Sequence, residues 1–101
     1  MLKQKLMETS ELVSKTTELF YQNKINEGYE KLQILLEEIS NRMNEIFLHK
    51  QNGNEIGIEE NKLVEVLNEA LAALEIKDTL LFSDIFEYEL KDLFDQIIKV
   101  L

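Results

Sequence analysis

The most regular stretch of the chain reads INEGYEKLQILLEEISNRMNEIF and spans residues 25–47. Its apolar residues recur at alternating steps of four and three, at Ile25, Tyr29, Leu32, Leu36, Ile39, Met43 and Ile46. This spacing places them in one stripe, because an α-helix completes a turn in about 3.6 residues. The stretch therefore predicts a long amphipathic helix over about residues 26–49, with a stripe that other helices must cover.

Three further helices are expected on either side of this stretch, because apolar residues recur there with the same spacing. They cover about residues 2–22, 58–77 and 79–100. The first is the least apolar, since Thr9, Thr16 and Thr17 lie on or beside its stripe. Branching at Cβ lowers helix propensity. We therefore expect the first helix to be the most weakly held of the four.

The connections between these helices are expected to be short. Asn23 and Asn26 flank the first break, because asparagine tolerates left-handed backbone and caps helix starts. The Asn- and Gly-rich residues 50–57 predict one longer loop. Asp78 or Thr79 is expected to cap the last helix.

The composition leaves little room for other structure. There is no proline and there are only three glycines in 101 residues, so few segments can form turns. No segment shows the alternation of a β-strand. Short breaks between helices favour antiparallel neighbours. The sequence therefore predicts one all-α domain over residues 1–101, folded as an antiparallel up-and-down four-helix bundle.

The charge of the chain argues against nucleic-acid and membrane partners. It has 20 acidic and 11 basic residues, with a net charge of −1 in residues 1–50 and −8 in residues 51–101. Phosphate backbones and anionic lipid surfaces repel such a protein. An apolar run of about 18 residues, which a membrane span needs, is absent, and the first residues do not form a signal peptide. A cytoplasmic protein without disulfides is therefore expected.

Few residues offer chemistry. His49, the only histidine, lies where the second helix is expected to end, and its favoured role is to offset the helix dipole. A di-iron bundle needs Glu-x-x-His pairs, whereas Glu45 lies four residues before His49. The loop fails as a calcium site, since Ile56 and Leu63 fall where oxygen ligands are required. We therefore expect no catalytic residue, no metal and no cofactor, and hence no enzyme.

The back of the fourth predicted helix carries the residues that point most clearly to a function. With the apolar stripe at the centre of the buried face and about 100° per residue, Leu81 and Tyr88 lie on the exposed side and Ile85 at its edge. Apolar residues gathered on an exposed helix face are typical of a protein-interaction surface. We expect a partner to bind there, with Asp84 and Glu87 at the rim.

The same construction places Glu89 about 60° from the centre of the buried face. A carboxylate inside an apolar arc must find a partner or change its protonation. We expect Glu89 to meet a lysine or a threonine hydroxyl of the first helix.

The end of the chain resembles a group of small uncharacterised helical proteins of bacteria of the Gram-positive type. The likeness rests on LNEAL at residues 67–71 and on LFSDIFEYEL at residues 81–90, which ends in an Asp-hydrophobic-hydrophobic-Glu-Tyr-Glu-Leu run. This resemblance implies no particular activity. In size, acidity and helix plan the chain is also similar to flagellar secretion chaperones, which bind the terminal helices of an export substrate. That second likeness is one of architecture, which does not by itself imply function.

These observations favour a non-enzymatic protein that binds a partner, such as a chaperone or adaptor for an amphipathic helix, with the first helix swinging away to admit it. One alternative is a structural homodimer that pairs through its exposed faces. Another is an acidic antagonist that binds a basic partner through its second half.

Overall fold

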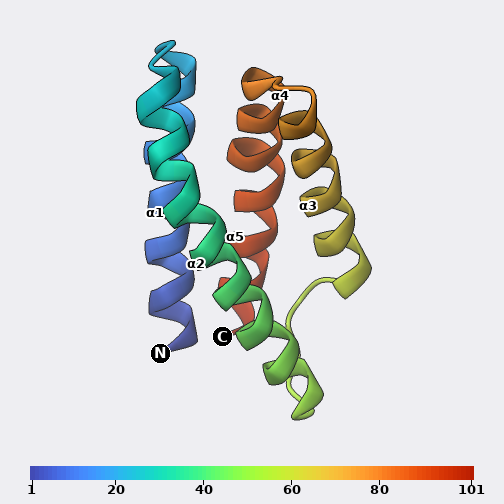
Figure 1. Cartoon of the computed structure of the whole chain (residues 1–101). Coiled ribbons are helices and arrows are strands. Elements are labelled where there is room, and N and C mark those ends of the chain that lie inside the picture. Colours follow the sequence, from blue (N-terminus) through green and yellow to red (C-terminus); the bar gives the residue numbers. More distant parts are fainter.

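The computed structural model describes residues 1–101 and consists of helices with short connections (Figure 1). Helix α1 spans Leu2–Tyr21, α2 spans Ile25–Gln51 and α3 spans Glu60–Glu75. The fourth helix is continuous but has three parts, which are α4 at Thr79–Asp84, the π-helical segment η1 at Ile85–Leu90 and α5 at Lys91–Val100. The predicted all-α class and the four predicted helices are confirmed.

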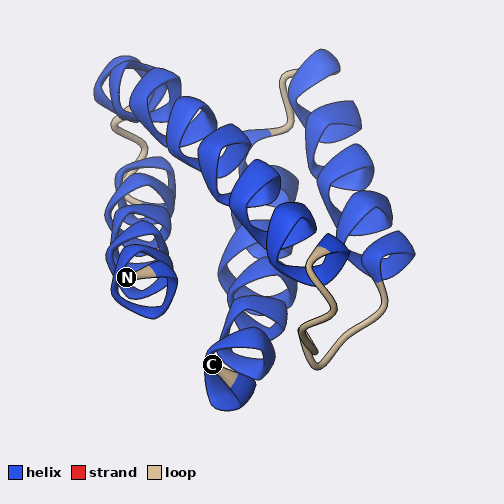
Figure 2. Cartoon of the chain, turned by 90° about the horizontal axis from the view of Figure 1, so that it is seen from below, coloured by secondary structure: helices blue, strands red, loops and turns tan.

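The helices run alternately up and down, so both chain ends lie at the same end of the molecule (Figure 1). We call the opposite end, where α1 and α3 finish, the upper end. Helix α1 packs on both α2 and the fourth helix, whereas α3 packs on the fourth helix. Helix α2 crosses the bundle diagonally (Figures 1 and 2), and it does not pack along the length of α3. Helix α1 is therefore the helix that approaches α2 most closely, while apolar side chains of α2 also enter the common core.

Phenylalanine side chains join α1 to the fourth helix in the core. Phe20, Phe82, Phe86 and Phe94 are at most 1% exposed. The ring of Phe82 meets the edge of Phe20 with 6.1 Å between centroids, and it lies 4.4 Å from the centroid of Phe86. Burial of a side chain of this size contributes about 1.5–3 kcal/mol. These rings therefore account for much of the attachment between the two helices.

One type of turn ends α1, α2 and α3. The residue after each helix cap has a positive φ, at Asn23 (59°), Gly53 (88°) and Lys77 (58°). The backbone amides of that residue and of the next one donate hydrogen bonds to carbonyls of the last helical turn, as in a Schellman motif. The turn satisfies backbone groups that would otherwise lack partners at the helix ends.

The predicted helix boundaries differ from the observed ones by at most two residues, since α2 continues to Gln51 and α3 spans Glu60–Glu75. The break at Asn23 is confirmed, but Asn26 does not cap α2, which begins at Ile25 after Lys24. The tight turn after α1 leaves no room for another residue before the second helix starts. Asp78 caps the fourth helix as expected, and its carboxylate accepts a hydrogen bond from the Leu81 amide at 3.0 Å.

Helices α1 and α2 approach each other closely at Gly28. A Cβ atom at this position would lie 2.5 Å from the ring of Phe20. That ring also meets Tyr29 edge-on, with 5.4 Å between the ring centroids. The absent side chain of Gly28 therefore makes the space in which Phe20 is buried.

Candidate functional site

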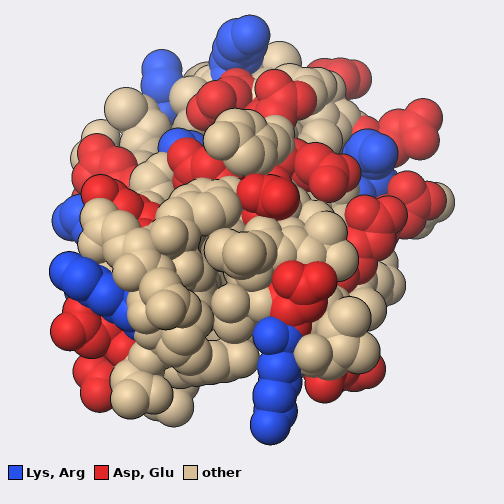
Figure 3. Space-filling view, turned by 90° about the horizontal axis from the view of Figure 1, so that it is seen from above, with Lys and Arg blue, Asp and Glu red and all other residues tan.

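Exposed apolar side chains gather at the upper end of the molecule, around the start of the fourth helix. We call five of them the α4 surface: Tyr21, Ile76, Leu80, Leu81 and Tyr88. Ile76 and Tyr88 are the most open, at 73% and 70% exposed. Seen from above, uncharged atoms occupy the middle of this end and acidic side chains border them (Figure 3). A concentration of this kind is typical of an interaction site.

The segment η1 changes which residues of the fourth helix face the core. In a π-helix the backbone bonds join residues five apart, so a turn contains more residues than an α-turn and each residue rotates by less than 100°. The smaller rotation turns Ile85 and Glu87, the neighbours of the buried Phe86, towards the core. It turns Glu89 away from the core.

Three of the five residues expected at the partner surface are exposed there. Leu81 and Tyr88 are 45% and 70% exposed, and Asp84 is exposed between them. The predicted place of Ile85 at the edge of this surface is wrong, since the side chain is only 5% exposed. The predicted place of Glu87 at the rim is also wrong, because its half-buried side chain faces α1. Both differences follow from the rotation in η1.

Glu87 fastens η1 to α1. The hydroxyls of Ser14 and Thr17 donate hydrogen bonds to its carboxylate at 3.1 Å, and the Lys91 ammonium donates at 3.2 Å. Lys91 also donates to the Ser14 hydroxyl at 2.6 Å. The Glu87 side chain is 24% exposed, so its charge is satisfied largely by these protein groups.

The contact predicted for Glu89 is made by Glu87. A glutamate of the fourth helix does meet a threonine hydroxyl of the first helix, but Glu89 itself is exposed. Its expected position inside the apolar arc is wrong, because that position assumed an uninterrupted α-helix. The hydroxyl-rich side of α1 thus attaches this helix to η1.

Tyr21 connects the end of α1 to the α4 surface. Its hydroxyl donates a hydrogen bond to the Asp84 carboxylate at 2.5 Å. Burial and this hydrogen bond to a charged acceptor raise the pKa of Tyr21 well above the ordinary value of a phenol. Tyr21 therefore remains a neutral donor, and it holds the exposed Asp84 carboxylate in place.

A second polar cluster joins α1 to α2 around Arg42, which the sequence interpretation did not single out. Arg42 is 7% exposed. Its guanidinium donates to Glu38 at 3.0 Å, to Glu45, and to the Thr9 hydroxyl of α1 at 3.4 Å. Lys5 of α1 donates to the same Glu45 at 3.2 Å.

The sequence contains a signal for this cluster. Arg42 lies three residues after Ile39 and four before Ile46, so it falls on the buried stripe of α2. Burial alone would raise the pKa of Glu45, but the hydrogen bonds from Lys5 and Arg42 outweigh it and hold that pKa below its ordinary value.

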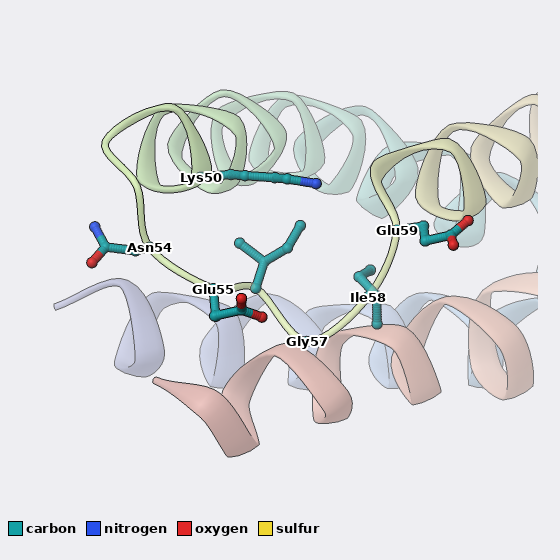
Figure 4. Close-up of a pocket in the computed structure, with 7 residues that line it drawn as sticks. Lys50, Asn54, Glu55, Gly57, Ile58 and Glu59 are labelled. Carbon is teal, nitrogen blue, oxygen red and sulfur yellow. The ribbon is translucent and has the colours of Figure 1, made fainter.

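A shallow hollow lies at the opposite end of the molecule, beside the loop that joins α2 to α3 (Figure 4). It has a volume of about 390 Å³ and is lined by Lys50 and residues 54–59. Lys50 extends along the hollow, whereas Asn54 and Glu59 point away from it (Figure 4). In the chain, no three His, Cys, Asp or Glu side chains come together as ligands for a metal ion. The hollow thus has no converging set of polar groups.

The fold and its surface features define a class of protein: a small all-α helical bundle with a candidate interaction surface at one end. The chain belongs to the family described as Domain of unknown function (DUF8042), whose model matches residues 2–100. No curated protein and no solved structure matches the chain. None of its helices combines the length and the apolar character needed to cross a membrane.

Proposed function

We propose that the protein is a non-enzymatic protein-binding module, a chaperone or adaptor that binds an amphipathic helix of its partner. The observation that carries this proposal is the α4 surface, where five large apolar side chains are 43–73% exposed. Monomeric proteins rarely leave a group of this kind in contact with water unless it serves binding. A partner helix laid across it would remove that apolar area from water.

The α4 surface is held by contacts that favour binding. Asp78 caps the start of α4, and the Tyr21 hydroxyl donates a hydrogen bond to Asp84 at the end of α4. Glu87 fastens the following segment to α1. Side chains fixed on a preformed surface lose less conformational freedom on association, so more of the contact energy contributes to affinity.

We place the partner on the outside of the bundle. The sequence instead favoured a partner that takes the place of α1 after this helix swings away. Helix α1 packs on both α2 and the fourth helix, and seven of its residues are buried. Swinging it away would expose Phe20 and break the hydrogen bonds of Glu87. Docking on the α4 surface avoids that cost.

The test is affinity capture from cells with the wild-type protein and matched variants. Leu81→Glu places a charge on the α4 surface, and Leu48→Glu does the same at the lower end of α2, where Leu48 is 57% exposed. We expect a stoichiometric partner that wild type and Leu48→Glu retain and that Leu81→Glu and Tyr88→Ala lose. If all three variants retain it, the α4 surface is not the binding site. Circular dichroism of each variant establishes that it is folded.

A structural homodimer is the second candidate, because the same apolar surface could meet its own copy about a two-fold axis. Light scattering over a range of protein concentrations decides this point. A monomer at high micromolar concentration removes the homodimer from consideration.

A further inference from the structure

The α4 surface has a strongly acidic border. Between residues 75 and 92 the chain carries six acidic residues and two lysines. One of these lysines, Lys91, is already paired with Glu87. Lys77 is therefore the one cation of this segment without a carboxylate partner. Figure 3 shows the result, with acidic groups next to the uncharged middle of the upper end and basic groups mainly at its margin.

Exposed carboxylates accompany the apolar side chains of this surface. Glu75 directly precedes Ile76, and Glu89 directly follows Tyr88. Asp84 lies one turn from both Leu81 and Tyr88 on the same helix. All three acidic residues are exposed, so a partner that covers the apolar groups must come close to their charges.

We propose that the segment that docks on the α4 surface is a basic amphipathic helix of another protein, an inference that rests on the protein-binding function proposed above. Its apolar stripe covers Leu80, Leu81 and Tyr88, and its lysine or arginine side chains meet the acidic border. Electrostatic complementarity of this kind selects partners and speeds their association.

The charge of the surface disfavours a second copy of this chain as the occupant. Two copies would bring the same carboxylates together, and each chain has a net charge of −9. Like charges that face each other across an interface oppose association. A cationic partner replaces this repulsion by attraction.

The dimensions of the surface suit a helix. Leu81 and Tyr88 are both exposed and lie seven residues apart in a helix that contains η1, which corresponds to at most about 10 Å along the axis at 1.5 Å per residue. A partner helix covers this distance with two successive turns, through apolar residues spaced at i, i+3 or i+4, and i+7.

The experiment measures fluorescence anisotropy with three designed peptides. The first is an amphipathic helix with leucine on one face and lysine on the others. The second keeps the leucine face and has glutamate in place of lysine, and the third has the composition of the first in an order without a leucine face. We expect the first peptide to bind and the other two to bind at least about tenfold more weakly, since both charge and the apolar stripe contribute.

Variants of the protein locate the binding. Glu75→Lys with Glu89→Lys reverses two charges of the border, and we expect at least about tenfold weaker binding of the lysine peptide, because attraction becomes repulsion. The control is Glu37→Lys with Glu55→Lys, which makes the same change in net charge at exposed positions outside the surface. We expect the control to retain affinity within about threefold, since salt screens distant surface charges.

The outcomes separate this inference from the proposed function. One outcome is that the lysine and glutamate peptides with a leucine face bind the wild type equally, and that Leu81→Glu abolishes the binding of both. The surface would then bind helices, and the requirement for a basic partner would be wrong. If no peptide binds the wild type, or if binding is insensitive to Leu81→Glu, both proposals fail at this surface. Dimerisation of the wild type that Leu81→Glu abolishes would assign the surface to a second copy.

Discussion

Thr17 of α1 donates a hydrogen bond to Glu87 of η1, with 3.1 Å between the hydroxyl and carboxylate oxygens, and thereby joins residues 70 positions apart. The contact requires the π-helical segment, because the smaller rotation per residue turns Glu87 towards α1. It also explains why the buried side of α1 can be rich in hydroxyl groups. Hydroxyl donors on this side of α1 satisfy a carboxylate that would otherwise lose its hydration on folding.

Replacing Glu87 is expected to destabilise the protein much more than replacing Glu89. Glu87→Ala removes a charged acceptor from Ser14, Thr17 and Lys91, and we expect a loss of about 1–3 kcal/mol in the free energy of unfolding. Glu89→Ala removes an exposed carboxylate from the same segment, and the expected change is within about 0.5 kcal/mol. Urea denaturation of both variants provides the measurement. A larger loss for Glu89→Ala would mean that the fourth helix has the register of an uninterrupted α-helix.

Gly28→Ala is expected to destabilise the protein although alanine favours helix. The added methyl group would lie 2.5 Å from the Phe20 ring, and overpacking of this kind costs about 1–3 kcal/mol. The gain in helix propensity is about 1 kcal/mol at most. A double-mutant cycle with Phe20→Leu identifies the cause, because the smaller side chain should relieve the clash. Additive effects of the two substitutions would contradict a direct contact.

Lys77→Gly is expected to stabilise the protein. Lys77 has a φ of 58°, a left-handed conformation that is unfavourable for a residue with a Cβ. Glycine removes this strain but makes the unfolded chain more flexible, so the net gain is about 0.5–1 kcal/mol. Thermal unfolding should show a higher Tm. Lys62→Gly serves as a comparison, because Lys62 lies in helix α3 and glycine there should lower Tm.

Acidification is expected to weaken the contact between α1 and α2 through Glu45. The pKa of Glu45 is lower in the folded protein than its ordinary value of 4.5, so the unfolded chain takes up the proton first as the pH falls. Stability from this group is therefore fully present well above pH 4.5 and is lost as the pH falls through the folded-state pKa.

Denaturation at a series of pH values measures this effect. Glu45→Gln should be less stable than wild type at pH 7, and the difference between the two proteins should shrink as the pH is lowered. Lys5→Met should reproduce part of the change, since it removes one of the two cations that donate to Glu45. A constant difference between wild type and Glu45→Gln at all pH values would show that Glu45 has no shifted pKa.

The sequence alone was sufficient for the helices, because each helix depends on information within a few turns. The spacing of Leu32, Ile39 and Ile46 defines the buried face of α2, and the absence of proline leaves the helices unbroken. The cap at Asp78 and the left-handed conformation of Asn23 are also local, because each depends on a residue at the end of the helix concerned. The exposure of Leu81 and Tyr88 was also predictable, since the smaller rotation in η1 still leaves Tyr88, two residues after the buried Phe86, on the side of the helix away from the core.

Only the tertiary structure decided which residues of the fourth helix face α1. A helical pattern with 100° per residue cannot anticipate η1, because the contacts of Glu87 come from another helix. This is why Ile85 is buried and why Glu87, and not Glu89, meets Thr17. The diagonal course of α2 and the burial of Arg42 likewise depend on what neighbouring helices offer. Periodicity determines which side of a helix is apolar, whereas packing determines which neighbour covers that side and how polar groups within it are satisfied.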